Sequence, residues 1–173
     1  MLDKLVDIAL AFGQNLIPCT VVDHYEKGVM LRFGKFRKVC EPGFHWKAPF
    51  IDKVLTQTVV PTTMNLGSQS LTTLDGKTVV VAAVVKYKIT DIETLLLEVY
   101  DAVDAIGDMT QAIIKECVMQ KNWADLQGTE IDDLITEKSK KEAKKWGLGI
   151  IRVTLTDVGI IRSIRLFNST SLS

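Results

Sequence analysis

The sequence has no net charge, few cysteines and no long hydrophobic run, and each absence removes a class of protein. Lysines plus arginines equal aspartates plus glutamates at 21 each among 173 residues, so no overall field favours nucleic acid. The three cysteines are an odd number and lie far apart, which excludes a disulfide framework and is typical of buried thiols in a reducing compartment. We therefore expect a cytoplasmic protein that does not bind nucleic acid.

Residues 1–19 predict an amphipathic N-terminal arm. The longest charge-free run, residues 8–22, is interrupted by polar residues, glycine and proline, and falls short of the about 20 apolar residues that a spanning helix needs. Asp3 and Asp7 also argue against the basic start of a signal peptide. The apolar stripe contacts either a membrane interface or a neighbouring subunit, and the pattern favours neither. Its residues are Leu2, Leu5, Val6, Ala9, Phe12 and Leu16.

Residues 20–72 predict a small β-rich unit that opens with a meander. Gly34 stands where a tight turn needs positive φ, and Pro42-Gly43 predicts a second turn. Pro49 follows a third short strand, because proline cannot donate to a ladder. The predicted strands are 29–33, 36–40, 44–47, 54–60 and 64–71.

Residues 73–166 predict an α+β unit with a mixed sheet and three helices, before a polar tail at 167–173. A hairpin signal at Asp75-Gly76 launches a long strand, 78–89. The three helices begin at Asp91, at Asp101 and at Thr129, the last with Asp132 as a capping-box partner. Gly147 ends the third helix, and strands follow at 150–157 and 160–166.

The sequence offers no constellation of catalytic residues. His24, Cys40 and His45 do not have the spacing of a zinc site, and a fourth ligand is missing. Cys117 lies on the apolar stripe of a helix, where thiols are usually inert. No phosphate-binding loop or nucleophile–base pair stands out. We predict no enzyme activity, no cofactor, no metal and no small-molecule substrate.

Two basic groups remain to be explained. The first surrounds the opening turns and comprises Lys35, Arg37, Lys38 and Lys47. Its alternative roles are protection of strand edges and contact with lipid headgroups. The second lies near the end of the third helix and contains Lys138, Lys141, Lys144 and Lys145. Its alternative roles are a solvated helix end and contact with an acidic neighbour or anionic lipid.

The opening of the chain resembles the SPFH or Band 7 family, which includes stomatins, prohibitins, flotillins and the bacterial HflK/HflC pair. A central strand near residues 73–91 and a closing strand after Trp146-Gly147 also resemble that family, so the likeness runs in collinear order over residues 20–165. The matching positions at the start are Gly28, Val29, Arg32, Phe33, Gly34, Lys35, Pro42, Gly43, His45, Pro49, Phe50, Ile51 and Asp52. These residues define turns and strands, and none is predicted to be catalytic.

The resemblance implies a non-enzymatic scaffold subunit that self-assembles laterally into a ring or cage, peripheral to a membrane. Its expected partners are copies of itself, membrane lipid, and a membrane or assembly protein. Family members usually carry an N-terminal anchor and a C-terminal coiled coil, so we expect this chain to be either an excised domain or a natural minimal version without the coiled coil. One alternative is a structural ring subunit of a viral or phage particle, and hence a virion component. The other is a lipid- or peptide-binding module.

Overall fold

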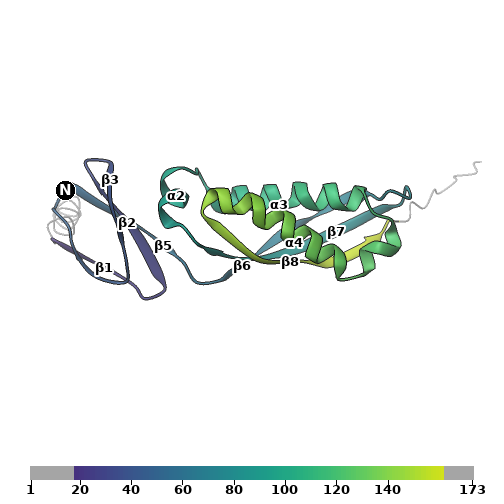
Figure 1. The fold of residues 1–173 in the computed structure, drawn as a ribbon, viewed down its shortest axis with the longest axis horizontal. Coiled ribbons are helices and arrows are strands. Elements are labelled where there is room, and N and C mark those ends of the chain that lie inside the picture. Colours follow the sequence, from purple (N-terminus) through teal and green to yellow (C-terminus); the bar gives the residue numbers. More distant parts are fainter. Residues whose placement is uncertain (1–17, 162–173) are drawn as a thin grey trace, which may run out of the picture.

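The computed structural model describes residues 18–161. The predicted contact residues of the arm, Leu2 to Leu16, and the predicted polar tail lie outside the described residues. Within them, strands β1 to β5 gather at one end of an elongated arrangement, and a long sheet with its helices makes up the other (Figure 1). We call these the N-terminal unit, residues 19–58, and the C-terminal unit, residues 62–160.

The N-terminal unit contains two small antiparallel sheets. One has the order β3-β2-β5, and the other pairs β1 with β4. The predicted meander is therefore wrong in its third strand, which pairs with β1 and not with β3. The physical reason is the left-handed φ of 128° at Gly43, which redirects the chain just after β3. The strands are β1 (Cys19–Val22), β2 (Glu26–Arg32), β3 (Lys35–Cys40), β4 (Gly43–Trp46) and β5 (Asp52–Thr58).

The turn between β2 and β3 has the expected chemistry. Arg32 pairs with Lys35, which leaves a two-residue loop of Phe33 and Gly34. Both loop residues have positive φ, 50° and 77°, as a tight hairpin with right-handed strand twist requires. The predicted role of Gly34 is confirmed, and Phe33 is held in a conformation that non-glycine residues rarely adopt.

The C-terminal unit is built on one sheet with the order β6-β7-β8: β6 (Thr62–Thr72), β7 (Thr78–Ile89) and β8 (Leu148–Ile160). Both pairings are antiparallel, so the expected mixed sheet is wrong in this detail. The helices after β7 return the chain so that β8 runs against β7. β8 covers the predicted strand 150–157 and continues to Ile160 through bulges opposite β7, while the predicted strand 160–166 lies mostly outside the described residues. β6 shares this sheet, while the predicted domain boundary near residue 72 remains a prediction.

The two long helices, α3 and α4, lie on one face of this sheet (Figure 1). Asp91 caps α2, accepting hydrogen bonds from the backbone N–H groups of Glu93 and Thr94. Asp132 forms no capping box; its carboxylate accepts a hydrogen bond from Leu155 N at 3.1 Å and so links α4 to β8. The bounds are α2 (Ile92–Leu97), α3 (Ala102–Met119), the 3-10 helix η1 (Trp123–Gln127), α4 (Glu130–Ala143) and the 3-10 turn η2 (Lys144–Trp146).

The main hydrophobic core lies between the sheet and α3 and α4. Alternate residues of β7, from Val79 to Tyr87, face these helices and are buried. Gly107 on α3 lets the helix approach the sheet, since a Cβ there would stand 3.3 Å from the Met64 side chain. Leu134 on α4 is 38% exposed. No helix within residues 18–161 is long and apolar enough to cross a membrane.

Candidate functional site

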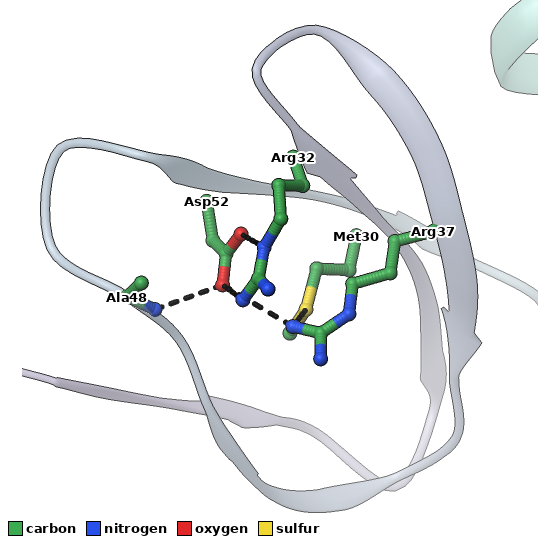
Figure 2. A network of polar contacts seen from close by, with 5 residues as sticks. All are labelled: Met30, Arg32, Arg37, Ala48 and Asp52. Carbon is green, nitrogen blue, oxygen red and sulfur yellow. Dashed lines mark hydrogen bonds and ion pairs between the residues drawn. The ribbon is translucent and has the colours of Figure 1, made fainter.

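The first basic group surrounds one buried carboxylate in the N-terminal unit. Asp52 opens β5 directly opposite Arg32, the last residue of β2. Arg32 holds it through two parallel hydrogen bonds, Nε to Oδ1 at 2.7 Å and Nη2 to Oδ2 at 2.8 Å (Figure 2). The Ala48 backbone N–H donates to Oδ2 at 2.8 Å, and Arg37 Nη1 lies 3.5 Å from the same oxygen. Two guanidinium groups from different strands thus meet at one carboxylate.

The hydrogen bonds of Asp52 fix its charge. Those from Arg32, followed by the one from Ala48 N–H, hold the pKa of Asp52 well below its usual range, against the opposing effect of burial. The same pairing raises the pKa of Arg32. Asp52 is therefore ionised at neutral pH, and it fastens the loop between β4 and β5 to the sheet. We call this arrangement the Asp52 clamp. Its role is structural, since both carboxylate oxygens already accept hydrogen bonds from Arg32 and Ala48.

An exposed apolar surface lies on the β1–β4 ribbon. Val21 pairs with Phe44 and Cys19 with Trp46, so all four side chains share one face of the ribbon. Val21, Phe44 and Trp46 are 68%, 55% and 68% exposed. The rings of Phe44 and Trp46 pack edge to face, with centroids 5.5 Å apart and an interplanar angle of 88°. We call Val21, Phe44 and Trp46 the apolar ribbon surface.

A hollow of about 500 Å³ separates this ribbon from the Asp52 clamp. Its cations are only partly neutralised: among the described residues, Lys38 and Lys47 form no ion pair, although Lys47 is half-buried. The ring of His45 is engaged by the backbone, because its Nε2 lies 2.6 Å from the Glu41 carbonyl oxygen, to which only an N–H can donate. The hollow is lined by Arg32, Arg37, Lys38, Phe44, His45, Trp46, Lys47, Ala48 and Asp52.

The aromatic part of this site was missed by the sequence analysis, which singled out only the basic residues. Phe44 and Trp46 alternate along a short strand, a signal that is visible in the sequence. Their exposure was not visible, because it depends on the pairing of β4 with β1. Of the predicted basic group, Arg37, Lys38 and Lys47 meet at the hollow, whereas Lys35 lies beyond it at the hairpin.

The second basic group has a different environment at the end of α4. Lys138 pairs with Glu116 on α3 at 2.8 Å, and Lys145 pairs with Glu142 at 2.8 Å. Within the described residues, Lys141 and Lys144 form no ion pair. Half of this predicted group is therefore neutralised by nearby carboxylates.

The residues considered for chemistry are dispersed or buried. Burial raises the pKa of the Cys40 thiol and that of the Cys117 thiol, which disfavours a reactive thiolate. In residues 18–161, no three side chains of histidine, cysteine, aspartate or glutamate lie together as a metal site.

Comparisons with known proteins agree with this architecture. The model of the SPFH domain / Band 7 family matches residues 20–165, the same span as the resemblance noted in the sequence. The chain is 32% identical over 137 residues to the "Modulator of FtsH protease HflK" of Escherichia coli K12, covering 77% of this chain and 32% of that protein. It is 26% identical over 155 residues to an uncharacterized protein of Archaeoglobus fulgidus, covering 84% of this chain and 59% of that protein.

Protein HflK of Haemophilus influenzae is 27% identical over 129 residues, covering 73% of this chain and 32% of that protein. The chain thus spans between about a third and three fifths of these relatives' lengths. The family match, by contrast, extends over most of the chain and both of its structural units. This chain belongs to the SPFH domain / Band 7 family.

Proposed function

We propose that this chain is a non-enzymatic scaffold subunit that self-assembles laterally and lies against a membrane through its N-terminal unit. The observation that carries the proposal is the apolar ribbon surface beside the basic hollow, in a chain of this family. Trp46 has an indole N–H on an apolar ring, and such side chains favour the boundary between headgroups and acyl chains, where Phe44 and Val21 would add apolar contact. Lysines and arginines near an anionic leaflet each add about 1 kcal/mol of attraction.

The two features lie where one surface could use both. Phe44 and Trp46 form part of the ribbon and also line the hollow that holds Arg37, Lys38 and Lys47. When the rings enter the interface, the cations beside them lie at headgroup level. The predicted arm continues directly into β1, so its apolar stripe would enter the membrane from the same strand.

Lateral self-assembly is supported by the family and by the sheet of the C-terminal unit. Within the described residues, β6 and β8 each pair on one side only. Open edges of this kind are ready for contact with another chain unless they are covered. A ring needs two different surfaces that meet head to tail, and an open sheet with two distinct edges offers them.

The name of the E. coli relative describes a modulator of a protease. We propose for this chain a role of the same general kind, in which the assembly holds or regulates a membrane protein partner without catalysing a reaction. The relatives named above belong to bacteria and archaea, so the alternative of a phage structural subunit gains no support from them.

Vesicle flotation tests the membrane part of the proposal. The full chain should float with vesicles of phosphatidylcholine containing phosphatidylglycerol, and less with phosphatidylcholine alone. Binding should weaken as salt is raised, since surface attraction is screened. A chain that stays in the soluble fraction with both vesicle types would contradict membrane association.

Size measurement tests assembly independently. Light scattering or native mass spectrometry of the full chain should show species much larger than the 19.2 kDa of one copy. A single monomeric species at high concentration would contradict lateral assembly and favour the alternative of a monomeric lipid- or peptide-binding module.

A further inference from the structure

The hollow of the N-terminal unit holds more positive charge than its own carboxylate can neutralise. It is lined by four cationic side chains and by Asp52 as the only carboxylate among the described lining residues. Arg32 already takes both oxygens of Asp52. The guanidinium of Arg37 therefore has only weak partners. Its Nη1 lies 3.5 Å from Asp52 Oδ2 and donates to Met30 Sδ, a poor acceptor, at 3.9 Å.

A β-bulge brings the cations of β3 together. In the ladder between β2 and β3, Met30 pairs with Lys38 and Leu31 pairs with Phe36, so Arg37 is the extra residue. In a regular strand, successive side chains point to opposite faces. At this bulge both Arg37 and Lys38 line the hollow, and Figure 2 shows Arg37 directed toward Asp52. Bulges often redirect side chains in this way at functional sites.

We propose that this hollow binds the phosphate group of an anionic lipid headgroup, an inference that rests on the proposed membrane function. A phosphate has several acceptor oxygens and carries one or two negative charges. The planar guanidinium of Arg37 offers paired donors to such oxygens, while Lys38 and Lys47 act as point charges on either side. Asp52 and Arg32 hold the frame and do not need to move.

The surroundings favour a lipid as the source of the phosphate. Phe44 and Trp46 line the hollow and, together with Val21, also form the exposed apolar ribbon surface. A lipid can place its phosphate in the hollow while its glycerol and upper acyl chains lie against those rings. A free phosphate would use the cations and leave the rings in water.

The test compares two double variants, each of which removes two positive charges from a different part of the protein. Arg37→Gln with Lys47→Gln removes two cations from the hollow, and Lys141→Gln with Lys144→Gln removes two unpaired cations from the end of α4. Flotation is measured with phosphatidylcholine vesicles containing phosphatidic acid or phosphatidylglycerol. We expect the hollow pair to weaken binding at least about tenfold on phosphatidic acid vesicles, and the helix pair to leave it within about twofold. Unfolding curves of both variants confirm that they are folded.

Arg37→Lys tests the geometry of the site separately from its charge, since lysine keeps the positive charge and lacks the paired N–H donors of the guanidinium. We expect it to bind phosphatidic acid vesicles more weakly than the unmodified chain and more strongly than the hollow pair. Glycerol 3-phosphate and inorganic phosphate, titrated as soluble competitors, identify the source of the phosphate. Displacement of the chain from vesicles by millimolar competitor would overturn the lipid assignment in favour of a soluble phosphate ester.

The outcomes separate this inference from the proposed function. If the unmodified chain floats and both charge-removing pairs reduce binding equally, or neither reduces it, the membrane function stands and the phosphate site is refuted. If the unmodified chain does not float with any vesicle, both proposals fail. Selective loss in the hollow pair, without displacement by soluble phosphate, supports both.

Discussion

The two units of this molecule place their large apolar side chains in opposite ways. The N-terminal unit has a small buried cluster of its own, Val22, Met30 and Cys40, while several of its aromatic residues are exposed. The C-terminal unit buries a much larger apolar core between a three-stranded sheet and two helices, although single apolar residues such as Leu74 and Met119 remain exposed. The C-terminal unit therefore contains most of the buried core, and the N-terminal unit contains the exposed aromatic residues on which the proposed membrane contact depends.

The two basic groups differ in the same direction. At the end of α4, carboxylates one helical turn away or on the neighbouring helix pair with Lys138, Lys140 and Lys145. In the hollow, Lys38 and Lys47 have no such partner among the described residues, and Arg32 and Arg37 share one carboxylate. Three of the lysines near the end of α4 are therefore paired with carboxylates, whereas neither lysine of the hollow is paired within the described residues, and the two basic groups differ in how far their charge is compensated.

The largest expected effect tests how tightly each unit is packed around a left-handed glycine. Gly147 in the C-terminal unit and Gly34 in the N-terminal unit have nearly the same φ, 72° and 77°. A Cβ at Gly147 would collide with the backbone carbonyl of Asp91, whereas a Cβ at Gly34 would meet nothing within 4 Å. Gly147→Ala should lower the free energy of unfolding by about 3 kcal/mol or more, and Gly34→Ala by about 1 kcal/mol.

Urea denaturation followed by circular dichroism measures both glycine variants. The comparison isolates packing, because the backbone strain is common to the two. Equal losses of stability would show that the junction of η2, β8 and α2 is no tighter than the hairpin tip.

The next effect concerns the clamp of the N-terminal unit. Asp52→Asn leaves Arg32 and Arg37 without their shared charge, and we expect the midpoint of thermal unfolding to fall by several degrees. Asp157→Asn, at an exposed carboxylate on β8 without an ion pair among the described residues, serves as the matched control and should have no measurable effect. An equal midpoint for the two variants would contradict the role of the clamp.

The clamp also predicts an acid dependence. The folded-state pKa of Asp52 lies below that of the unfolded chain, about 3.9, so its stabilisation is present above that pH and is lost as pH falls toward the folded pKa. Asp75, whose pKa is lowered to about 2, contributes in the same direction. From pH 5 to pH 3 the unmodified chain should lose more stability than Asp52→Asn, as measured by urea denaturation at each pH.

A smaller effect separates exposed apolar residues that bind from those that do not. Phe44→Ala with Trp46→Ala should weaken vesicle binding about tenfold, because the rings supply the interfacial contact. Leu74→Ala with Met119→Ala removes apolar side chains that are 66% and 49% exposed in the C-terminal unit, and should not change binding. If both double variants lost vesicle binding to a similar extent, the membrane contact would not be specific to the N-terminal unit.

The smallest effect is expected in the compensated basic group. Glu116→Gln removes the partner of Lys138, an exposed pair with side chains 55% and 35% accessible. Exposed pairs add little to stability, so the thermal midpoint should change by a degree or less. If Glu116→Gln lowered the thermal midpoint as much as Asp52→Asn, the two basic groups would not differ in how much their ion pairs contribute to stability.

Much of the fold could be predicted because it depends on local geometry. Gly34, Gly76 and Gly147 have the positive φ that their turn positions imply, and β7 has the predicted bounds, residues 78–89. The wrong predictions depend on pairing at a distance. Nothing local tells β4 to join β1, and nothing local tells Asp132 to bond with Leu155 instead of capping its own helix.

The candidate site divides in the same way. Arg37, Lys38 and Lys47 could be predicted from the sequence, because lysines and arginines that cluster around short turns are recognisable without a structure. The aromatic half was not found, since Phe44 and Trp46 are as compatible with a buried strand as with an exposed one. The bulge that presents Arg37 is likewise a property of the ladder between β2 and β3.

The sequence by itself determined the family, the order of elements and the main turns, because glycine, proline and apolar periodicity act over a few residues. Only the tertiary structure decided which side chains remain outside and which cations go unpaired. The physical reason is that exposure and charge compensation depend on the neighbours that pairing and packing bring from elsewhere in the chain. In this protein those neighbours bury the apolar faces of α3 and α4 against the sheet of the C-terminal unit, and they leave Phe44 and Trp46 of the N-terminal unit exposed.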